Sequence, residues 1–179
     1  MRGILDITAI INFKCPRWNQ LPETPMFNRD VVEYINQILS PIFDDQEIIT
    51  STIIQNYSKR SVIPKLKGRK YDRSHIAYLI IISIYKQILN IEQVSYGVGL
   101  QLNLMHLNEG YDIFAEALER ALRITFMNVK DKANFFIPEQ RFDVNTEGVQ
   151  VIANAFAMKL LGIKILQAQG FRKVGEKNE

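Results

Sequence analysis

The stretch from Thr50 to Leu89 constrains the fold of this chain more than any other, because its pattern predicts two capped helices separated by a basic turn. The Thr50 hydroxyl can cap the first helix by accepting hydrogen bonds from the free amides of its first turn. Apolar side chains at helical spacing then share one face: Ile53, Ile54 and Tyr57. The segment Val62-Ile63-Pro64 is expected to end this helix, since proline disfavours helical geometry in the residue before it.

The second helix of the pair is predicted to lie at the centre of the hydrophobic core. Asp72 or Ser74 is expected to cap it, and the residues of its buried face follow at helical spacing: Ile76, Leu79, Ile80, Ser83, Ile84, Gln87 and Ile88. The run Leu79–Ile82 adds apolar residues beyond one stripe, so most sides of this helix must be covered. Between the two helices, Gly68 permits a tight, hairpin-like reversal.

Positive charge is concentrated in the same stretch. Seven Lys or Arg residues and one acid, Asp72, lie between Lys59 and Arg73, so these fifteen residues have a net charge of +6. The whole chain has a net charge of only +3, and the remainder is therefore slightly acidic. Such a patch on a short helix and its following loop is expected of a protein that binds phosphates, although basic loops are also common as plain solvated surface.

The predicted outward face of the first helix suits contact with a nucleic acid. It carries hydroxyl, amide and cationic side chains: Thr52, Gln55, Asn56, Lys59 and Arg60. Groups of these kinds hydrogen-bond to base edges and phosphates. A short helix and a basic wing held on a rigid central helix follow the plan of a winged helix-turn-helix. The sequence therefore predicts a protein that binds double-stranded DNA.

Several residues of this stretch also follow a specific order and spacing. They are the capping Thr50, the late Tyr57, Val62-Ile63-Pro64, the wing ending Arg69-Lys70-Tyr71, the cap Asp72 and the link Leu89–Val94. Through them residues 50–94 resemble the DNA-binding domain of MerR-type transcription regulators. The resemblance implies side chains near the major groove, Thr52, Gln55, Asn56 and Tyr57, and side chains on flanking phosphates, Lys67, Arg69 and Lys70. The predicted nucleic-acid-binding set is completed by Lys59, Arg60, Lys65, Tyr71 and Arg73.

The segment departs from that family at several positions. MerR-type regulators usually have Arg where this chain has Thr52 and Gln55, Tyr at Asn56, and Gly at Ser61. These departures favour a second interpretation, a non-catalytic protein-interaction module on a winged-helix scaffold that has lost DNA binding. A longer segment, residues 17–94 with its opening Arg-Trp-x-x-Leu-Pro, resembles an uncharacterised bacterial family described only as a domain of unknown function. That resemblance implies no activity.

The predicted fold class is mainly α, with a MerR-like winged helix-turn-helix in the N-terminal half and a C-terminal pair of long helices. Three parts are expected: an irregular or partly extended arm over 1–27, a winged-helix domain over 28–100, and a helical region over 101–179. Asn28–Leu39 is the nearest candidate for the first helix of the motif, and Ser40-Pro41 is expected to interrupt it. A short helix should follow from Ile91, weakened by Gly97 and Gly99, which suggest a close backbone approach or an end near residue 98.

The C-terminal region is expected to hold helices over about 108–127 and from residue 145 or 146 to about 169, with a loop over 128–143 that exposes the aromatic run 135–138. The last helix is apolar on most sides, so it must be covered on most sides. We expect a homodimer joined through one face of it: Val149, Ile152, Phe156, Leu160 and Ile163. In the alternative, the two C-terminal helices cover one another within a monomer.

Composition limits the remaining possibilities. An apolar content of 47% supports a sizeable core. The single cysteine, Cys15, excludes an internal disulfide and fits a reducing cytoplasm, where we expect the protein to reside; a buried, incidental thiol is favoured over a sensor. No membrane span is predicted, since Ile4–Phe13 is short and contains Asp6 and Asn12. We expect it to be an N-terminal strand or a packing arm.

Catalytic patterns are sparse. The two histidines, His75 and His106, have no partner at ligand spacing, and His75 is expected to be a surface or capping residue. There is no glycine-rich phosphate loop or nucleophile elbow, so we expect no enzyme activity, cofactor or metal. An unrecognised enzyme or small-ligand binder that uses the C-terminal helices remains a third interpretation beside the DNA regulator and the interaction module.

Overall fold

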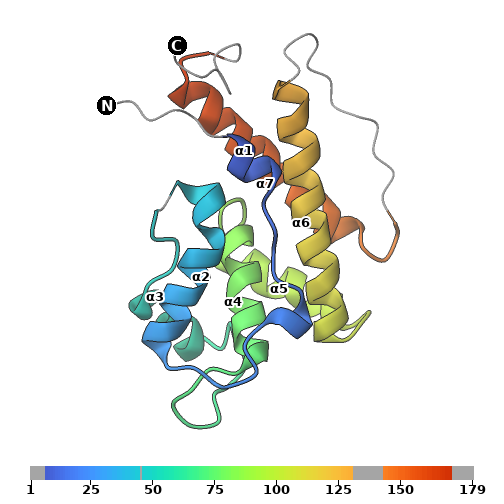
Figure 1. Ribbon diagram of the computed structural model, residues 1–179. Helices are drawn as coiled ribbons and strands as arrows, with labels where there is room; N and C mark the ends of the chain where they lie inside the picture. Colours follow the sequence, from blue (N-terminus) through green and yellow to red (C-terminus); the bar gives the residue numbers. More distant parts are fainter. Residues whose placement is uncertain (1–6, 45, 131–142, 171–179) are drawn as a thin grey trace.

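The computed structural model describes residues 7–44, 46–130 and 143–170, and within them the chain is mainly α-helical, as predicted. These residues form seven α-helices and one short 3-10 helix, without a β-strand (Figure 1). The predicted β-wing is therefore not visible. The one β-type pairing among the described residues is an isolated antiparallel bridge between Met26 and Tyr71.

The four helices from α2 to α5 begin at the expected places because their caps are local. They are α2 (Asn28–Phe43), α3 (Ser51–Lys59), α4 (Arg73–Tyr85) and α5 (Ile91–Leu102). The Thr50 side chain accepts from the N–H of Ile53 at 3.2 Å, and Asp72 accepts from the N–H of His75 at 3.2 Å. The predictions of Thr50 and Asp72 as caps are thus confirmed. Each cap satisfies amides that the helix itself leaves unpaired.

Helix α2 does not stop before Pro41, as the sequence led us to expect, but continues to Phe43. Proline at this position removes the hydrogen bond that an N–H would make to the carbonyl of Gln37. The Ser40 hydroxyl donates to that carbonyl instead, at 3.0 Å. The helix ends at Asp44, whose φ of 52° is left-handed. The lost backbone bond is therefore replaced locally, and the helix survives its proline.

The N-terminal arm is more ordered than predicted. A strand or a packing arm was expected at its start, and the described residues there form the short helix α1 (Ile7–Ile11), which packs on the core through Ile7 and Ile10. The 3-10 helix η1 (Trp18–Gln20) follows. Glu119 on α6 anchors the arm, with ion pairs to Arg17 at 2.7 Å and Lys14 at 3.1 Å, and accepts from the N–H of Cys15 at 3.0 Å. Burial acts to raise the pKa of Glu119, but these hydrogen bonds outweigh it and hold that pKa below its ordinary value.

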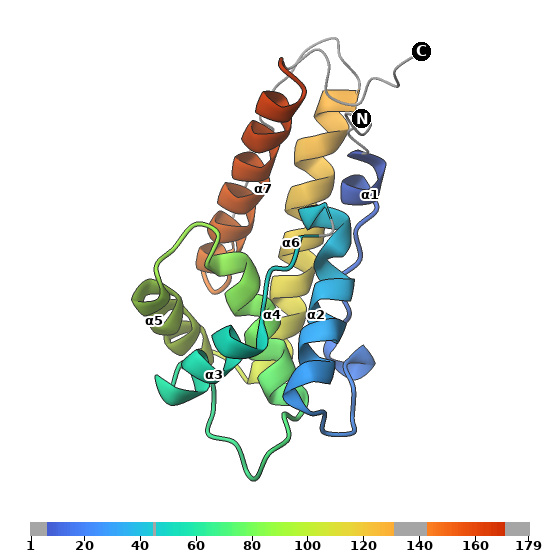
Figure 2. The same ribbon diagram turned by 90° about the vertical axis from the view of Figure 1, so that its left-hand side faces the viewer.

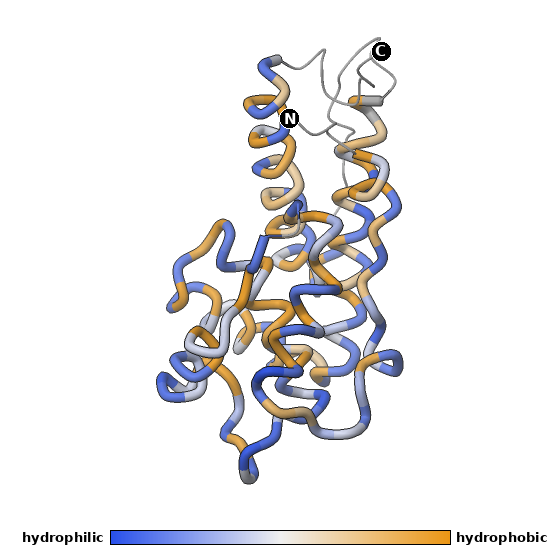
Figure 3. The backbone as a smooth tube through the Cα atoms, turned by 60° about the vertical axis from the view of Figure 1, so that its left-hand side comes forward, coloured by the Kyte–Doolittle hydropathy of each residue, from blue (hydrophilic) through white to orange (hydrophobic). Residues whose placement is uncertain are grey.

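Helix α4 lies at the centre of the molecule, as its sequence predicts. Ten of its thirteen residues are buried. Around it, one continuous cluster of buried side chains draws on the arm and on every helix from α1 to α7, so the predicted boundary near residue 100 does not divide the core. Figure 3 shows the hydrophobic centre of the fold and its hydrophilic lower tip, where the loop between α3 and α4 turns.

The two long C-terminal helices, α6 (Leu107–Lys130) and α7 (Glu147–Gln167), confirm the predicted pair. They run in the same direction and pack along their length, with their C-terminal ends at the top of Figure 2. Packing within one chain buries Val149, Phe156 and Leu160, which are 2–5% exposed. These three side chains were predicted to join a dimer, and they are instead covered by their own chain. The monomeric alternative accounts for their burial.

Another face of α7 is left open. Val151, Met158, Ile163 and Leu166 are all exposed, between 37% and 79%. Ile152 is half-buried and Ile163, at 39%, is the exposed member of the predicted dimer set. By length and composition alone, α7 is the one helix in the described ranges that could cross a membrane, and a core helix of a folded domain passes the same test. About 39% of its most apolar stretch is buried inside the protein.

The glycines of α5 do not mark a close approach. A Cβ placed on Gly97 or on Gly99 would meet no atom within 4 Å, and the helix continues past both to Leu102. Their effect is to leave space beside the helix. The loop was predicted over 128–143, but α6 continues to Lys130, so its first three residues are helical. Residues 131–142 of that loop and the tail over 171–179 lie outside the described residues.

Candidate nucleic-acid interface

A single side chain of α2 holds the segment that leads into α3. The Asn36 Oδ1 atom accepts from the N–H groups of Ile48 and Ile49 at 2.8 and 3.2 Å, and its Nδ2 atom donates to the Ile49 carbonyl at 2.8 Å. Three backbone groups of the connecting segment are thereby satisfied without a regular turn. Ile54, which is fully buried, then fixes α3 on the core. Asn36 thus links α2 to the segment directly before α3.

The outer face of α3 presents the side chains that the sequence predicted there. Thr52, Gln55, Asn56 and Lys59 are all exposed, on the face opposite Ile54. Tyr57 is half-buried, and this burial raises the pKa of its hydroxyl. The exposed groups are a hydroxyl, two amides and an ammonium, which together can donate to and accept from base edges and phosphates.

The basic loop between α3 and α4 projects from the end of the molecule away from the α6–α7 pair, as Figures 1 and 2 both show. Two residues give it its turns: Ser61 with φ 55° and Gly68 with φ 99°, both in the left-handed region. The expected reversal at Gly68 is confirmed. The loop forms no hairpin because Tyr71 exchanges both backbone hydrogen bonds with Met26 of the arm, at 2.8 and 2.9 Å.

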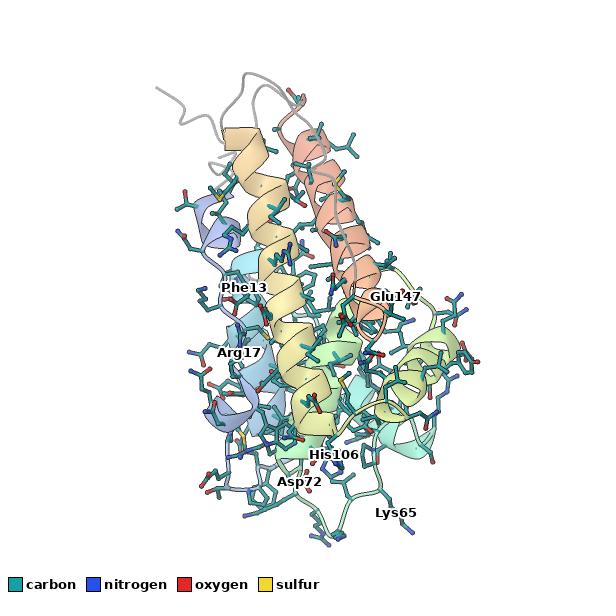
Figure 4. The ribbon with its side chains drawn as sticks, turned by 90° about the vertical axis from the view of Figure 1, so that its right-hand side faces the viewer. Phe13, Arg17, Lys65, Asp72, His106 and Glu147 are labelled. Atoms are coloured by element: carbon teal, nitrogen blue, oxygen red, sulfur yellow. The ribbon has the colours of Figure 1, made fainter. Side chains whose placement is uncertain are left out.

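His75 closes the base of this loop. Its Nδ1 atom lies 2.7 Å from Asp72 Oδ1, and its Nε2 atom lies 3.1 Å from the Pro64 carbonyl oxygen. The ring is only 3% exposed. The expected capping role is confirmed, and the structure adds the bond to Pro64. Because the two ends of the loop meet on one imidazole, the tip from Lys65 to Lys70 is presented from a fixed base (Figure 4, lower end).

Five of the seven cations predicted for the interface are free of acidic partners in the part of the chain that the structure describes. They are exposed: Lys59, Lys65, Lys67, Arg69 and Lys70. Lys70 lies over the ring of Phe27, 4.7 Å from its centroid. Arg60 pairs with Glu92 of α5 at 2.6 Å, although both side chains remain exposed. The helix face and the loop tip thus form one surface, which we call the cationic end.

Two residues of the predicted set do not belong to this surface. Tyr71 is buried, 5% exposed, and its hydroxyl accepts from Asn28 at 3.3 Å. Arg73 is half-buried, pairs with Glu23 at 3.0 Å and lies over the Trp18 ring. Both side chains attach the end of the loop to the arm. A sequence motif that ends in Tyr cannot show that the ring turns inward, because its partners lie more than forty residues upstream.

An open groove of about 590 Å³ lies beside the end of α3. Its walls include Arg60 and Glu92, and the exposed Tyr96 and Leu100 of α5. Sequence reasoning missed this surface, since α5 lies thirty residues away from α3 along the chain. It also missed the role of Asn36 and the contact of His75 with the Pro64 carbonyl. A polar residue beside the apolar stripe of α2 was the signal available for Asn36.

Groups suited to catalysis are not gathered elsewhere in the described residues. No group of three or more His, Cys, Asp and Glu side chains that could hold a metal is found among them. Cys15 is 2% exposed, with its sulfur 3.8 Å from the Tyr111 hydroxyl, and burial raises its pKa to about 12. Such a thiol stays protonated at neutral pH and is a poor nucleophile. The expectation of a buried thiol is confirmed.

The fold and this surface define an all-α protein with a cationic end made of a short exposed helix and a loop. Residues 16–118, more than half of the chain, match the family described as "Domain of unknown function (DUF1836)", and the chain belongs to that family. A search of curated proteins and a search of solved structures each found no match. The family match includes the cationic end and stops within α6.

Proposed function

We propose that this protein binds double-stranded DNA through its cationic end and acts as a transcription regulator. The observation that carries the proposal is the placement of polar, exposed α3 side chains next to five cations that have no acidic partner in the described ranges. Charge of one sign at one end of a molecule draws a polyanion to that end. The amides of Gln55 and Asn56 would then read base edges, while Lys67, Arg69 and Lys70 contact phosphates.

Local geometry supports the MerR-like assignment of this region. The order helix, link, helix, basic loop, helix and helix is that of α2 to α5. Ser61 has the positive φ for which a glycine is usual at this position of that family. An irregular loop stands here in place of a β-wing. Contacts with phosphates would therefore be made by flexible side chains on an irregular backbone. Lys and Arg can make such contacts without a strand.

Salt dependence of duplex binding tests the loop. We expect K67Q/R69Q/K70Q to weaken binding to every duplex sequence and to reduce the slope of log K against log salt by about 0.9 per lost phosphate contact. The control is R120Q/R123Q, which removes two exposed cations from α6, outside the cationic end. Fluorescence anisotropy with a random duplex at two or more salt concentrations gives both slopes. Equal slopes for wild type and the loop variant would remove the loop from the interface.

Base reading by α3 is tested separately. Alanine at Gln55 or Asn56 is expected to relax sequence preference at one position, at a cost of about 1–3 kcal/mol if the amide contacts adenine through two hydrogen bonds. Selection from a random duplex library measures the preference of each variant. Recovery of an unchanged consensus with both residues replaced would show that α3 does not read bases.

A homodimer is part of the proposal, because two copies would present two cationic ends to the half-sites of a palindrome. The open face of α7, with Val151, Met158 and Leu166, is the surface available for it once Phe156 and Leu160 are buried internally. Light scattering at micromolar concentration measures the mass. A particle of 20.7 kDa, the mass of one chain, would contradict the dimer.

The second candidate function is a non-catalytic protein-interaction module. The observation that favours it is the row of exposed apolar side chains on and after α5: Tyr96, Leu100 and Leu104, at 49–71%. Exposed apolar groups beside a groove are typical of protein interfaces. The salt-dependence experiment separates the two candidates, since an interaction module has no reason to bind a random duplex.

A further inference from the structure

A cavity of about 340 Å³ lies between α4, α5, α6 and the start of α7, and no part of the proposed DNA contact uses it. We propose that this cavity is a binding site for a small apolar molecule that is neutral or positively charged. The ligand would lie against Ile81, Tyr85, Tyr111, Phe114 and Val149, with residues of α5 in the lining as well. This site is independent of the proposed function, since it lies on the opposite face of α5 from the groove beside α3.

Glycines in the walls of the cavity leave space that larger side chains would fill. Native cores are packed about as densely as organic crystals, with few voids larger than a water molecule. Here, three helices each place a glycine in the lining: Gly97 on α5, Gly110 on α6 and Gly148 on α7. Helical glycine costs about 1 kcal/mol relative to alanine. A Cβ at Gly97 or Gly148 would meet no atom within 4 Å, so packing does not require the absence of a side chain there.

Size and lining define the apolar character of the ligand. Small-molecule sites in proteins have volumes of roughly 300–1,000 Å³ and apolar walls with a few polar groups. The cavity is at the lower end of this range and is lined mainly by aliphatic and aromatic side chains from four elements. A single aromatic ring system or a medium-length alkyl chain fits these dimensions.

Tyr85 adds a hydroxyl group to the wall of the cavity. The residue is 4% exposed, and burial raises its pKa above the ordinary value, so the hydroxyl remains a neutral donor. A neutral hydroxyl can donate a hydrogen bond to an acceptor on a ligand. The Gln101 amide, also in the lining, offers a second polar group.

Charge excludes one class of ligand. Among the described residues, the lining contains the carboxylate of Glu147, at the first turn of α7, and no Lys, Arg or His. Figure 4 shows Glu147 at the end of α7 that faces α5. A carboxylate ligand would meet a like charge and no cation, whereas an amine would meet an opposite charge. The structure therefore favours neutral or cationic apolar molecules over fatty acids.

The experiment uses the full chain without DNA, so its result does not depend on the proposed function. The neutral dye N-phenyl-1-naphthylamine reports binding by its fluorescence, and octylamine, octanol and octanoate compete for the site with the same hydrocarbon chain. We expect octylamine and octanol to displace the dye at concentrations at least about tenfold below octanoate. Equal displacement by all three would overturn the charge assignment, and no dye binding would overturn the site.

Two glycines of α5 provide a matched pair of variants. Gly97→Leu places a side chain in the cavity, while Gly99→Leu places the same side chain on the opposite wall of α5, beside the groove. Both positions are helical and open, so both changes gain the same helix propensity. We expect Gly97→Leu to weaken dye binding by about tenfold or more and Gly99→Leu to leave it within about twofold. Thermal melts establish that both variants are folded.

Gly148→Leu fills the cavity from α7 and provides an independent test if Gly97→Leu does not fold. In the wild type, octylamine should displace the dye at concentrations about fivefold below those of octanol, because its ammonium group meets the carboxylate of Glu147. Glu147→Gln should remove this difference. Unchanged dye binding in both filled variants would place the dye elsewhere and overturn the proposal. Loss of binding in Gly99→Leu as well would indicate an effect on α5 as a whole and would also overturn it.

Discussion

The cationic end and the α6–α7 pair are built from similar short-range patterns but differ in what covers them. At the cationic end, the polar face of α3 and the loop tip are exposed, and a few buried anchors such as Ile54, Ile63 and Tyr71 hold them. In the pair, both helices bury long faces against each other, with Phe126 and Phe156 fully covered. The comparison teaches that substitutions at the cationic end should affect binding alone, whereas those in the pair should affect folding.

The largest expected effect lies in the pair. Phe156→Ala removes a ring that is 2% exposed and packs on Phe43 with centroids 5.7 Å apart. We expect a loss of about 3–5 kcal/mol in the free energy of unfolding, because the cavity left behind cannot close. The control on the same helix is Val151→Ala, at a position that is 50% exposed, where we expect about 0.5 kcal/mol or less. Urea unfolding followed by circular dichroism measures both, and equal losses would mean that Phe156 is not part of the core.

The attachment of the arm to α6 should be the next largest effect, and it should depend on pH. Glu119→Gln replaces a carboxylate that holds Arg17, Lys14 and the Cys15 N–H. We expect a cost of about 2 kcal/mol at neutral pH, since bonds to charged groups are among the stronger ones. Trp18, the single tryptophan of the chain, lies on the arm beside Tyr111 and reports its release by fluorescence.

The sign of the pH dependence follows from the lowered pKa of Glu119 in the folded protein. A carboxyl group of this kind adds stability above its ordinary pKa, 4.5, and loses that contribution as pH falls through the folded value. The wild type should therefore lose stability below about pH 4.5 more steeply than Glu119→Gln. Parallel acid titrations of the two proteins would contradict this assignment.

The two histidines differ in burial, so alanine variants of them test whether the base of the loop contributes to stability. His75→Ala removes a buried ring that joins Asp72 to the Pro64 carbonyl, and we expect a cost of about 1–2 kcal/mol. His106→Ala, at an exposed position before α6, should cost about 0.5 kcal/mol or less. Thermal unfolding measures both. If His75→Ala were as stable as His106→Ala, the contacts of His75 with Asp72 and Pro64 would not contribute to the free energy of unfolding.

The smallest expected effect is on the stability of the loop variant. K67Q/R69Q/K70Q changes three exposed side chains without ion pairs among the described residues, so its free energy of unfolding should stay within about 0.5 kcal/mol of wild type. The same protein is expected to lose duplex binding. A large loss of stability would show that these cations support the fold. The distinction between a binding role for the cationic end and a folding role for the α6–α7 pair would then be wrong.

Local features were predictable because they depend on neighbours in the sequence. Thr50 and Asp72 cap the helices that follow them by accepting from N–H groups three residues further on. The apolar periodicity of residues 76–84 marks a central helix. The expected break at Pro41 was wrong for an equally local reason, since Ser40 supplies the missing donor. The expectation failed because it counted the hydrogen bond lost at Pro41 but not the one that the Ser40 hydroxyl makes to the same carbonyl.

The α-helical class, the positions of the caps and the concentration of cations between Lys59 and Arg73 can all be predicted from the sequence. Which of those side chains are free, which face of α7 is covered and where a cavity remains become known only from the folded chain. These outcomes depend on partners that are distant in sequence: Tyr71 with Met26, Arg73 with Glu23, and Phe156 with Phe43. Periodicity fixes which side of a helix is apolar, but it carries no information about what packs against that side.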